Sequence, residues 1–283
     1  MRITPSLNIV VALSCEAKPL VDYYRLTKQA VTGLSYFSRE ADQNFPFNIH
    51  LVVSGIGARN MATACGWLGA NSRKDNCVWL NVGVAGHKEH RLGEIVRINK
   101  ASELGSAKNY YPALVAKWSE MNIGLISYSE PCTDYPANAV VDMEAYTFFE
   151  VVNKFSNKEL VQSLKIISDN SKNGIEAINA ARVSGLIAEK IETINSFVEN
   201  LLNLLRLSAP LPKTLMETQH LHVTVSQLQQ YHDLVEKLIN LGIANSDIKK
   251  KLSSASTMKE LLIELREIQQ KTAPNLNLSA ESA

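Results

Sequence analysis

Short apolar runs alternate with longer mixed stretches over about the first 175 residues. The runs are rich in β-branched residues, and the gaps between them are long enough for a helix. This pattern predicts an α/β domain with a largely parallel or mixed central sheet. The expected strands are Ile9–Leu13, Ile49–Val53, Val78–Val82, Glu94–Ile98, Gly124–Tyr128, Ala139–Asp142 and Leu164–Ile167.

Three of these strands lead into turns that glycine or an acid marks, namely Ser54–Gly57, Gly83–Gly86 and Ser168–Asp169. A helix over Ala145–Phe155 is expected after the sixth strand. From Val183 to Leu205, apolar residues recur at helical spacing and predict one long amphipathic helix. The prolines after residue 208 are expected to end it.

Two further helical stripes follow that break. One runs from Leu228 to Ile239 and is closed by Gly242, and the next begins at the capping box Thr257–Glu260. The chain is therefore expected to consist of a catalytic domain over 1–208, a small C-terminal helical appendage over 213–272 and a disordered tail over 273–283.

The composition narrows the class of protein. With 46% hydrophobic residues, 20% charged residues and a net charge of +1, the chain has no electrostatic signature for nucleic acid or a membrane surface. No apolar run approaches the roughly 20 residues that span a bilayer, and the N-terminus has no signal-peptide cleavage site. Four scattered cysteines without a CxxC pair indicate reduced thiols and a cytoplasmic protein. Among them, Cys15 lacks an obvious histidine partner that would make it a nucleophile.

Three carboxylates follow predicted strands: Glu16, Glu144 and Asp169. Ligands bind at the carboxyl ends of strands in open α/β sheets, so these acids indicate an active site. Each acid also has a simpler explanation when taken alone. Glu144 would be favoured at a helix start by the helix dipole, and Asp169 would cap a turn.

Three such acids suit cleavage of an N-glycosidic bond. The transition state resembles an oxocarbenium ion, with positive charge on the sugar and negative charge on the leaving base. The reaction needs an acid for the base, a group that directs the nucleophile, and a carboxylate on the ribose hydroxyls near the cationic sugar.

Five segments carry the candidate acids and glycine turns: Ser14–Leu20, Val53–Gly57, Asn81–Gly86 with Leu92–Val96, Val141–Ala145 and Ile166–Asp169. The sequences and order of these segments resemble the nucleoside phosphorylase/nucleosidase superfamily, and most of all its methylthioadenosine/S-adenosylhomocysteine nucleosidase branch. The resemblance covers residues 7–205 and implies a three-layer α/β/α sandwich around a mixed, partly barrel-like sheet, assembled as a homodimer or larger homo-oligomer.

The resemblance also implies roles for individual residues. Glu16 matches the acid that orients the hydrolytic water, and Asp169 matches the aspartate that protonates the purine at N7. Glu144 matches the glutamate that binds the ribose hydroxyls, with Met143 packing on the sugar. The Ala85–Gly86 segment matches the backbone that lines the pocket for base and ribose.

Two departures from the superfamily bear on the nucleophile and the base. Where the phosphorylases hold phosphate with an arginine and a serine, this chain has Asn81 and Val84, and the carboxylate of Glu16 repels phosphate. The base loop of the nucleosidases is replaced by Tyr128–Pro136, where Tyr128 or Tyr135 could stack on a base. Groups that remain available to an anion are the backbone of Ser54–Gly57, Arg59 and Arg91.

Histidines at metal-like spacings occur in two places, His87 and His90 around Glu89, and His220 with His222. Neither set has a third ligand nearby in the sequence, so no metal and no cofactor are expected.

The leading hypothesis is a nucleosidase, a hydrolase that cleaves a purine-type nucleoside with water. A phosphorylase, a glycosyltransferase with phosphate as co-substrate, is the alternative on the same scaffold. A non-catalytic nucleoside-binding protein with a helical module for a partner is a third possibility, although a pure binder has no need of an acid for the leaving group.

Overall fold

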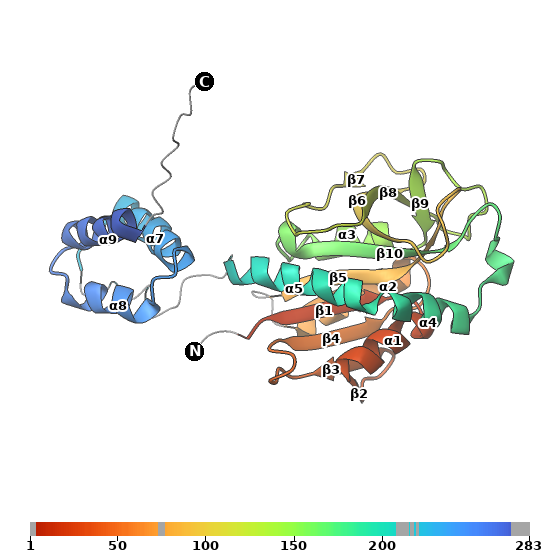
Figure 1. The fold of residues 1–283 in the computed structure, drawn as a ribbon, viewed down its shortest axis with the longest axis horizontal. Helices are drawn as coiled ribbons and strands as arrows, with labels where there is room; N and C mark the ends of the chain where they lie inside the picture. Colours follow the sequence, from red (N-terminus) through yellow and green to blue (C-terminus); the bar gives the residue numbers. More distant parts are fainter. Residues whose placement is uncertain (1–3, 73–76, 208–214, 216–217, 219–220, 273–283) are drawn as a thin grey trace, which may run out of the picture. The chain divides into compact units, whose positions relative to one another are not determined.

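The computed structural model describes residues 4–72, 77–207, 215, 218 and 221–272. They divide into two compact units, an α/β unit over Ile3–Ser208 and a second unit that carries the C-terminal helices (Figure 1). Each unit has its own apolar core.

The strands of the α/β unit form one mixed sheet with the order β10-β6-β8-β9-β5-β1-β4-β3-β2, while β7 pairs with β6. Their bounds are β1 Ser6–Val11, β2 Thr27–Gln29, β3 Ser35–Arg39, β4 Asn48–Val53, β5 Cys77–Gly86, β6 Ile95–Glu103, β7 Asn109–Tyr110, β8 Met121–Ser127, β9 Ala139–Asp142 and β10 Val161–Asp169.

Helices cover both faces of this sheet (Figure 1). Helices α1 (Ser14–Tyr24), α4 (Ala180–Glu189) and α5 (Ile191–Leu207) share one core with the sheet, and α2 (Ala58–Asn71) and α3 (Ala145–Val152) share the other. Two short 3-10 helices, Lys158–Leu160 and Ile175–Ala177, flank β10. The predicted three-layer α/β/α architecture is confirmed.

Alternation within the strands explains the two cores. In β1, Leu7 and Ile9 point to the core under α1, α4 and α5, whereas Val10 belongs to the opposite core with Val52 of β4. All four side chains are fully buried. A strand buried on both faces needs an uninterrupted apolar run, and such runs are the pattern from which the parallel strands were predicted.

The sheet closes on itself at one side. Strand β10 pairs in parallel with β5 and antiparallel with β6, while β9 joins β8 to the end of β5 through Gly86 and Val141. The ring β5-β9-β8-β6-β10 is therefore barrel-like, as the resemblance implies. A β-bulge interrupts the β10–β5 ladder between Ile167 and Asp169.

Several predicted boundaries are wrong. Gly83–Gly86 and Ser168–Asp169 are the last residues of β5 and β10 rather than turns, because Asp169 still pairs with Gly86. Strands β2, β3 and β7 were not predicted. Most of their residues are only half-buried, so they carry no apolar run.

The long helix expected from Val183 to Leu205 is two helices. Lys190 separates α4 from α5 by leaving the helical conformation, with φ −105° and ψ 7°. The apolar stripe continues across this break and therefore does not reveal it. Helix α3 ends at Val152, earlier than Phe155, and α5 ends at Leu207, while the prolines expected to stop it lie outside the described residues.

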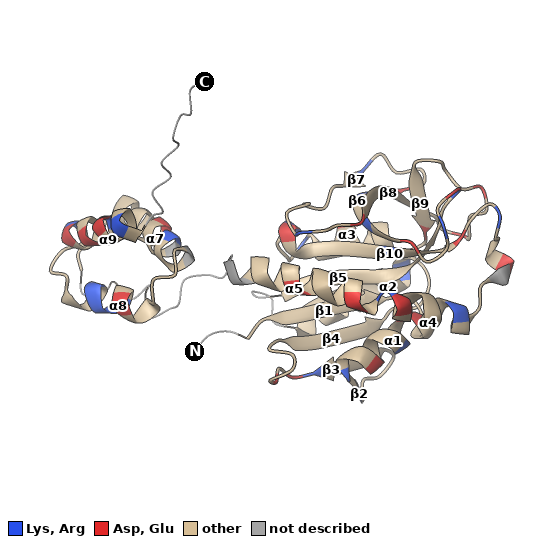
Figure 2. Cartoon of the chain, viewed as in Figure 1, with Lys and Arg blue, Asp and Glu red and all other residues tan. Residues whose placement is uncertain are grey.

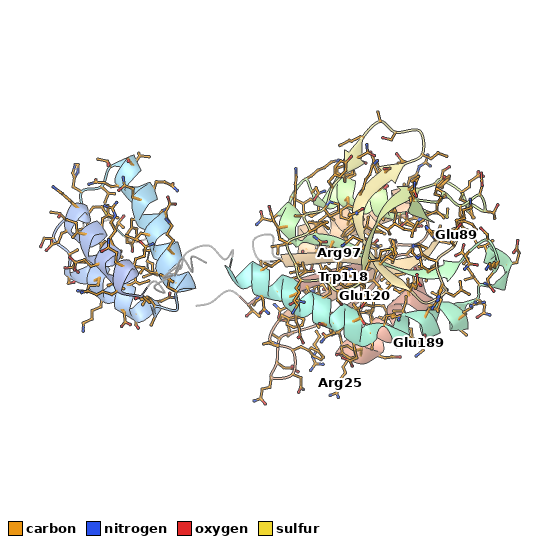
Figure 3. The ribbon with its side chains drawn as sticks, turned by 45° about the horizontal axis from the view of Figure 1, so that its top comes forward. Arg25, Glu89, Arg97, Trp118, Glu120 and Glu189 are labelled. Atoms are coloured by element: carbon orange, nitrogen blue, oxygen red, sulfur yellow. The ribbon has the colours of Figure 1, made fainter. Side chains whose placement is uncertain are left out.

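Helix α5 is fastened to the sheet through Phe197. The Trp118 ring lies edge-on to Phe197 with centroids 4.9 Å apart, and the Arg97 guanidinium lies 5.7 Å from the same ring. Figure 3 shows Arg97 and Trp118 beside α5. Arg97 is buried but donates to Asn122 and to the Ala116 carbonyl, so its charge is compensated by polar groups.

The described part of the C-terminal unit contains α7 (Val225–Asn240), α8 (Asn245–Ser254) and α9 (Met258–Thr272). Gly242, at φ 87°, follows α7 in the left-handed conformation, and the Thr257 hydroxyl accepts from Glu260 N at the start of α9. Helix α8 was not predicted, and residues 273–283 lie outside the described part. Positive and negative residues are interspersed over both units (Figure 2).

Candidate active site

Glu16 lies at the start of α1 and is buried. Its Oε2 accepts from the backbone N–H groups of Ala12 and Leu13, both at 2.9 Å, and its Oε1 accepts from Val84 N at 2.9 Å. Burial raises the pKa of Glu16, against the opposing influence of Lys165 and these N–H groups. The carboxylate thus ties the β1–α1 connection to β5 and still has room for one more donor on Oε1.

A buried lysine that the sequence reasoning missed lies beside Glu16. A methyl group added to Gly83 would come within 2.8 Å of Glu16 Oε1 and 3.2 Å of Lys165 Nζ. Gly83 therefore leaves space for both side chains at the middle of β5. Lys165, on β10, is the partner of Gly83 in the strand register.

Lys165 forms an ion pair with Asp142, whose Oδ2 lies 2.8 Å from Nζ. Burial disfavours the charge of Lys165, but Asp142, Glu144 and Glu16 outweigh that effect and raise its pKa. Asp142 also accepts from the Ser127 hydroxyl and from Ala145 N. One ammonium therefore serves three buried carboxyl groups.

Glu144 is the third of these carboxyl groups. Its Oε1 accepts from Gly57 N at 2.7 Å, the residue that precedes α2. Burial and the neighbouring Asp142 raise the pKa of Glu144 to about 7, although Lys165 and the Gly57 N–H oppose the shift. Among the described residues, none donates a hydrogen bond to Oε2, so this oxygen is available to a ligand.

Glu144 is the N-cap residue of α3, but its side chain does not cap the helix. No hydrogen bond runs from its side chain to its own helix. That task falls to Asp142, which accepts from Ala145 N at 2.9 Å. A capping hydrogen bond is therefore not what holds the Glu144 side chain, although its place at the N-terminus of α3 still suits the helix dipole.

Asp169 is the last residue of β10, and each of its carboxyl oxygens accepts a hydrogen bond from a hydroxyl group. Ser168 donates to Oδ1 and Tyr135 to Oδ2. The turn that follows is capped by Asn170, whose Oδ1 accepts from the backbone N–H groups of Lys172 and Asn173. Asp169 is thus not needed for that turn, which removes its simpler explanation.

Gly86 makes the close approach around Asp169 possible. A Cβ at this position would lie 2.5 Å from Asp169 Oδ2 and 2.4 Å from Cε1 of Tyr135. Neighbouring Ala85 is buried, and its carbonyl accepts from Ser168 Oγ at 3.4 Å. The predicted Ala85–Gly86 segment therefore lies directly against the predicted acid.

The structure brings Glu16 and Glu144 together around Lys165 and places Asp169 four residues further along the same strand. That spacing is roughly 13 Å along an extended strand. Met143 is half-buried beside Glu144 in sequence, and it makes no polar contact within the described chain. The three predicted acids thus lie along the joined carboxyl ends of β5, β9 and β10.

The residues at the expected phosphate positions are occupied by other contacts. Asn81 is buried, donates to the Val10 carbonyl and accepts from Ser163, and Val84 N is bound to Glu16. Gly57 N is bound to Glu144, so this N–H of the Ser54–Gly57 turn already holds a carboxylate. The remaining cationic candidates, Arg59 and Arg91, are exposed.

Cys15 has a partly buried side chain, and its pKa is raised by burial and by Glu16. A thiol that keeps its proton is a weak nucleophile.

Among the described residues no group of three His, Cys, Asp or Glu side chains could hold a metal ion. His87 Nδ1 accepts from two backbone N–H groups, and His90 contacts Glu94 at 2.7 Å. His220 lies outside the described part.

A hollow of about 560 Å³ lies elsewhere on the α/β unit, between α1 and α4. Its walls include Cys15, Pro19 and Gly185, and none of the three acids lines it. We therefore locate the candidate site by its chemistry, at the acids.

Within 4–72, 77–207 and 221–272 no helix is long and apolar enough to cross a membrane.

Sequence reasoning found the three acids but missed Lys165, Asp142 and Ser127. Lys165 stands inside a strand whose residues are all buried, so a lysine within an otherwise apolar run was the available signal. Asp142 ends a predicted strand two residues before Glu144, and the same strand-end argument would have included it.

No protein-family model and no curated protein matches the sequence. Solved structures match the α/β unit. The 5'-methylthioadenosine/S-adenosylhomocysteine nucleosidase of Helicobacter pylori is 14% identical, with a TM-score of 0.58 over 70% of this chain and 99% of that one. The corresponding enzyme of Campylobacter jejuni gives 17% identity and a TM-score of 0.55 over 69% and 99%. The futalosine hydrolase of Helicobacter pylori gives 14% and 0.55 over 72% and 99%. The α/β unit therefore has the fold of the nucleoside phosphorylase/nucleosidase superfamily.

Proposed function

We propose that this protein is a nucleosidase that cleaves the N-glycosidic bond of a purine-type nucleoside with water. The observation that carries the proposal is the set of buried acids along one strand end, with Glu16 and Glu144 around Lys165 and Asp169 further along β10. The structural neighbours support the general reaction, since they are named as hydrolases of nucleosides.

In this proposal Asp169 protonates the leaving base. Protonation at N7 draws electrons out of the glycosidic bond and leaves the base as a neutral molecule. Asp169 is buried at the end of β10.

Glu144 binds the ribose hydroxyls through its unoccupied oxygen, with Met143 against the sugar. As the sugar becomes cationic, a carboxylate held near it stabilises the charge. Gly57 N fixes the other oxygen, so the carboxyl group is oriented before the ligand arrives.

Glu16 orients the attacking water. Three of its acceptor positions are filled by backbone N–H groups, and a water bound at the remaining position on Oε1 would be held next to Gly83. Water is favoured over phosphate because Val84 N and Gly57 N already bind carboxylates and, within the described residues, no buried arginine contacts these acids. The protein needs no cofactor in this mechanism.

The test is a panel of nucleosides incubated with the purified full-length protein, with and without phosphate. The panel contains 5'-methylthioadenosine, S-adenosylhomocysteine, futalosine, adenosine and inosine, and free base and sugar product are measured. Release of base and unphosphorylated sugar without phosphate is the expected result. Base release that requires phosphate and gives the sugar 1-phosphate would instead establish the phosphorylase.

Asp169→Asn separates an enzyme from a nucleoside-binding protein. Loss of the proton donor should reduce kcat about 10²- to 10⁴-fold while ligand affinity is largely retained. Asp134→Asn, an exposed acid in the β8–β9 loop, is the matched control and should keep full activity. Ligand binding without turnover in the wild type would favour the binding protein.

We also propose that the protein acts as a homodimer or larger homo-oligomer. Large apolar side chains are exposed on the segment from residue 104 to residue 121, and they include Leu104, Tyr111, Leu114, Val115 and Met121. Such a concentration of exposed apolar groups is typical of a protein interface. The molar mass in solution, measured by light scattering, tests this assembly.

A further inference from the structure

The connection between β8 and β9 carries one buried aromatic side chain in an otherwise open loop. Residues 129–134 are exposed or half-buried, whereas Tyr135 is 7% exposed. A single buried side chain in such a loop must be held by specific contacts.

Those contacts are with the proposed acid. The Tyr135 hydroxyl donates to Asp169 Oδ2, and its ring lies against Gly86, where a Cβ would be only 2.4 Å from Cε1. Burial and Asp169 raise the pKa of Tyr135, so the phenol keeps its proton at neutral pH. Because Ser168 donates to Oδ1, both oxygens of Asp169 are engaged by side chains of the chain itself.

The backbone of the loop does not fix Tyr135. Residues 129–136 make no backbone-to-backbone hydrogen bond with any other described residue, whereas Tyr128 N still donates to the Asp142 carbonyl. The contacts that hold Tyr135 are thus those of its hydroxyl and its ring. If the Tyr135 side chain left Asp169, no backbone hydrogen bond of the sheet would be broken.

We propose that Tyr135 determines which leaving groups the site admits, because its phenol occupies the place on Asp169 that a base must take. A ligand reaches the acid only by displacing this hydroxyl. The ligand that can do so is a planar heterocycle with a nitrogen that pairs with the Asp169 carboxyl and a ring that replaces the phenol against Gly86. This inference rests on the proposed function and specifies how that site selects its aglycone.

The selection follows from the difference between two exchanges. A purine replaces both the hydrogen bond and the ring contact of Tyr135, so the acid is not left unpaired. A leaving group without a suitable nitrogen would break the Tyr135–Asp169 bond and offer nothing in return. The site therefore selects leaving groups that can replace both the hydrogen bond and the ring contact of Tyr135.

Binding of free adenine to the full-length protein, measured by titration calorimetry, tests the proposal. Tyr135→Phe keeps the ring and removes the competing hydroxyl, so adenine should bind about three- to tenfold more tightly than to the wild type. Tyr23→Phe, which removes a tyrosine hydroxyl that contacts Glu192 on α5, should leave the affinity unchanged. Unchanged binding in Tyr135→Phe would overturn the proposal, and weaker binding would show that the hydroxyl contacts the ligand instead.

Tyr135→Ala removes the ring as well and should also bind adenine more tightly than the wild type. If neither Tyr135 variant binds adenine, although both retain the circular dichroism spectrum of the wild type, displacement by a purine is refuted. Turnover of the nucleoside panel reports separately on the proposed function. Hydrolysis with no change of affinity in Tyr135→Phe would refute only the role of Tyr135, whereas tighter binding without hydrolysis would refute only the nucleosidase.

Discussion

Strand β10 carries two polar regions that are built in opposite ways. At Lys165, one ammonium and several backbone N–H groups hold three carboxyl groups, and the region is a network of ionisable groups around one cation. At Asp169, one carboxyl group is held by two hydroxyls, Ser168 and Tyr135. The charged region is permanent, because its partners come from strands and helix ends. The hydroxyl region can exchange a partner, because Tyr135 comes from a loop.

The largest loss of unfolding free energy is expected when Lys165 is replaced by methionine. This change leaves Asp142, Glu144 and Glu16 without their shared cation, and breaking such a buried pair costs about 3–5 kcal/mol of unfolding free energy. Lys18→Met removes the exposed partner of Asp22 and should cost less than about 1 kcal/mol. Chemical denaturation of both variants at pH 7.5 measures the difference. Equal stabilities would mean that Lys165 does not compensate the buried acids.

Sequence reasoning succeeded where a chemical group follows an apolar strand. Glu16, Glu144 and Asp169 could be placed at one sheet edge because the carboxyl ends of the strands meet there. Lys165 could not be placed, because a lysine in a strand carries no information on which side chains surround it. Its partners come from α1, β9 and the start of α3, and only the closed sheet brings them together.

The same limit applies to Tyr135 and to the edge strands. The sequence suggested Tyr128 and Tyr135 as residues for a base, but it could not show that Tyr135 reaches an acid 34 positions away. Strands β2 and β3 are partly exposed, so their apolar content is too low to predict them. Only the structure shows the strand pairing of the closed sheet, because the hydrophobic pattern indicates which residues are buried but not which residues they contact.

The pH dependence of stability sharpens the comparison at the charged region. The raised pKa of about 7 means that folded Glu144 keeps a proton that the unfolded chain releases near pH 4.5. Stability therefore falls as the pH rises from about 4.5 to 7, by about 3 kcal/mol in total for this group, and the loss is complete above pH 7.

Glu144→Gln should remove this contribution. The variant should gain stability relative to the wild type as the pH rises through that window, which denaturant titrations at several pH values would measure. Glu120→Gln changes an exposed acid and should follow the wild type at each pH. A constant difference between Glu144→Gln and the wild type would contradict the assignment of the shift to Glu144.

The smallest expected effect concerns the hydroxyl region. Gly86→Ala places a methyl group against Tyr135 and Asp169 and should cost about 1–3 kcal/mol. Part of this cost should vanish in a Tyr135→Ala background, which a double-mutant cycle of unfolding free energies would detect. Gly66→Ala, on α2 with open space around the added methyl, should instead be neutral or stabilising.

The β-bulge between Ile167 and Asp169 decides how this region works. In a regular strand, consecutive side chains point to opposite faces, so Ser168 and Asp169 would be separated by the sheet itself. The additional residue locally changes that phase, and Ser168 then donates to the carboxyl group of its own neighbour. Two adjacent codons thus specify an acid together with its hydrogen-bond donor. A one-residue deletion that removed the bulge but kept Ser168 and Asp169 would place these two side chains on opposite faces of the sheet.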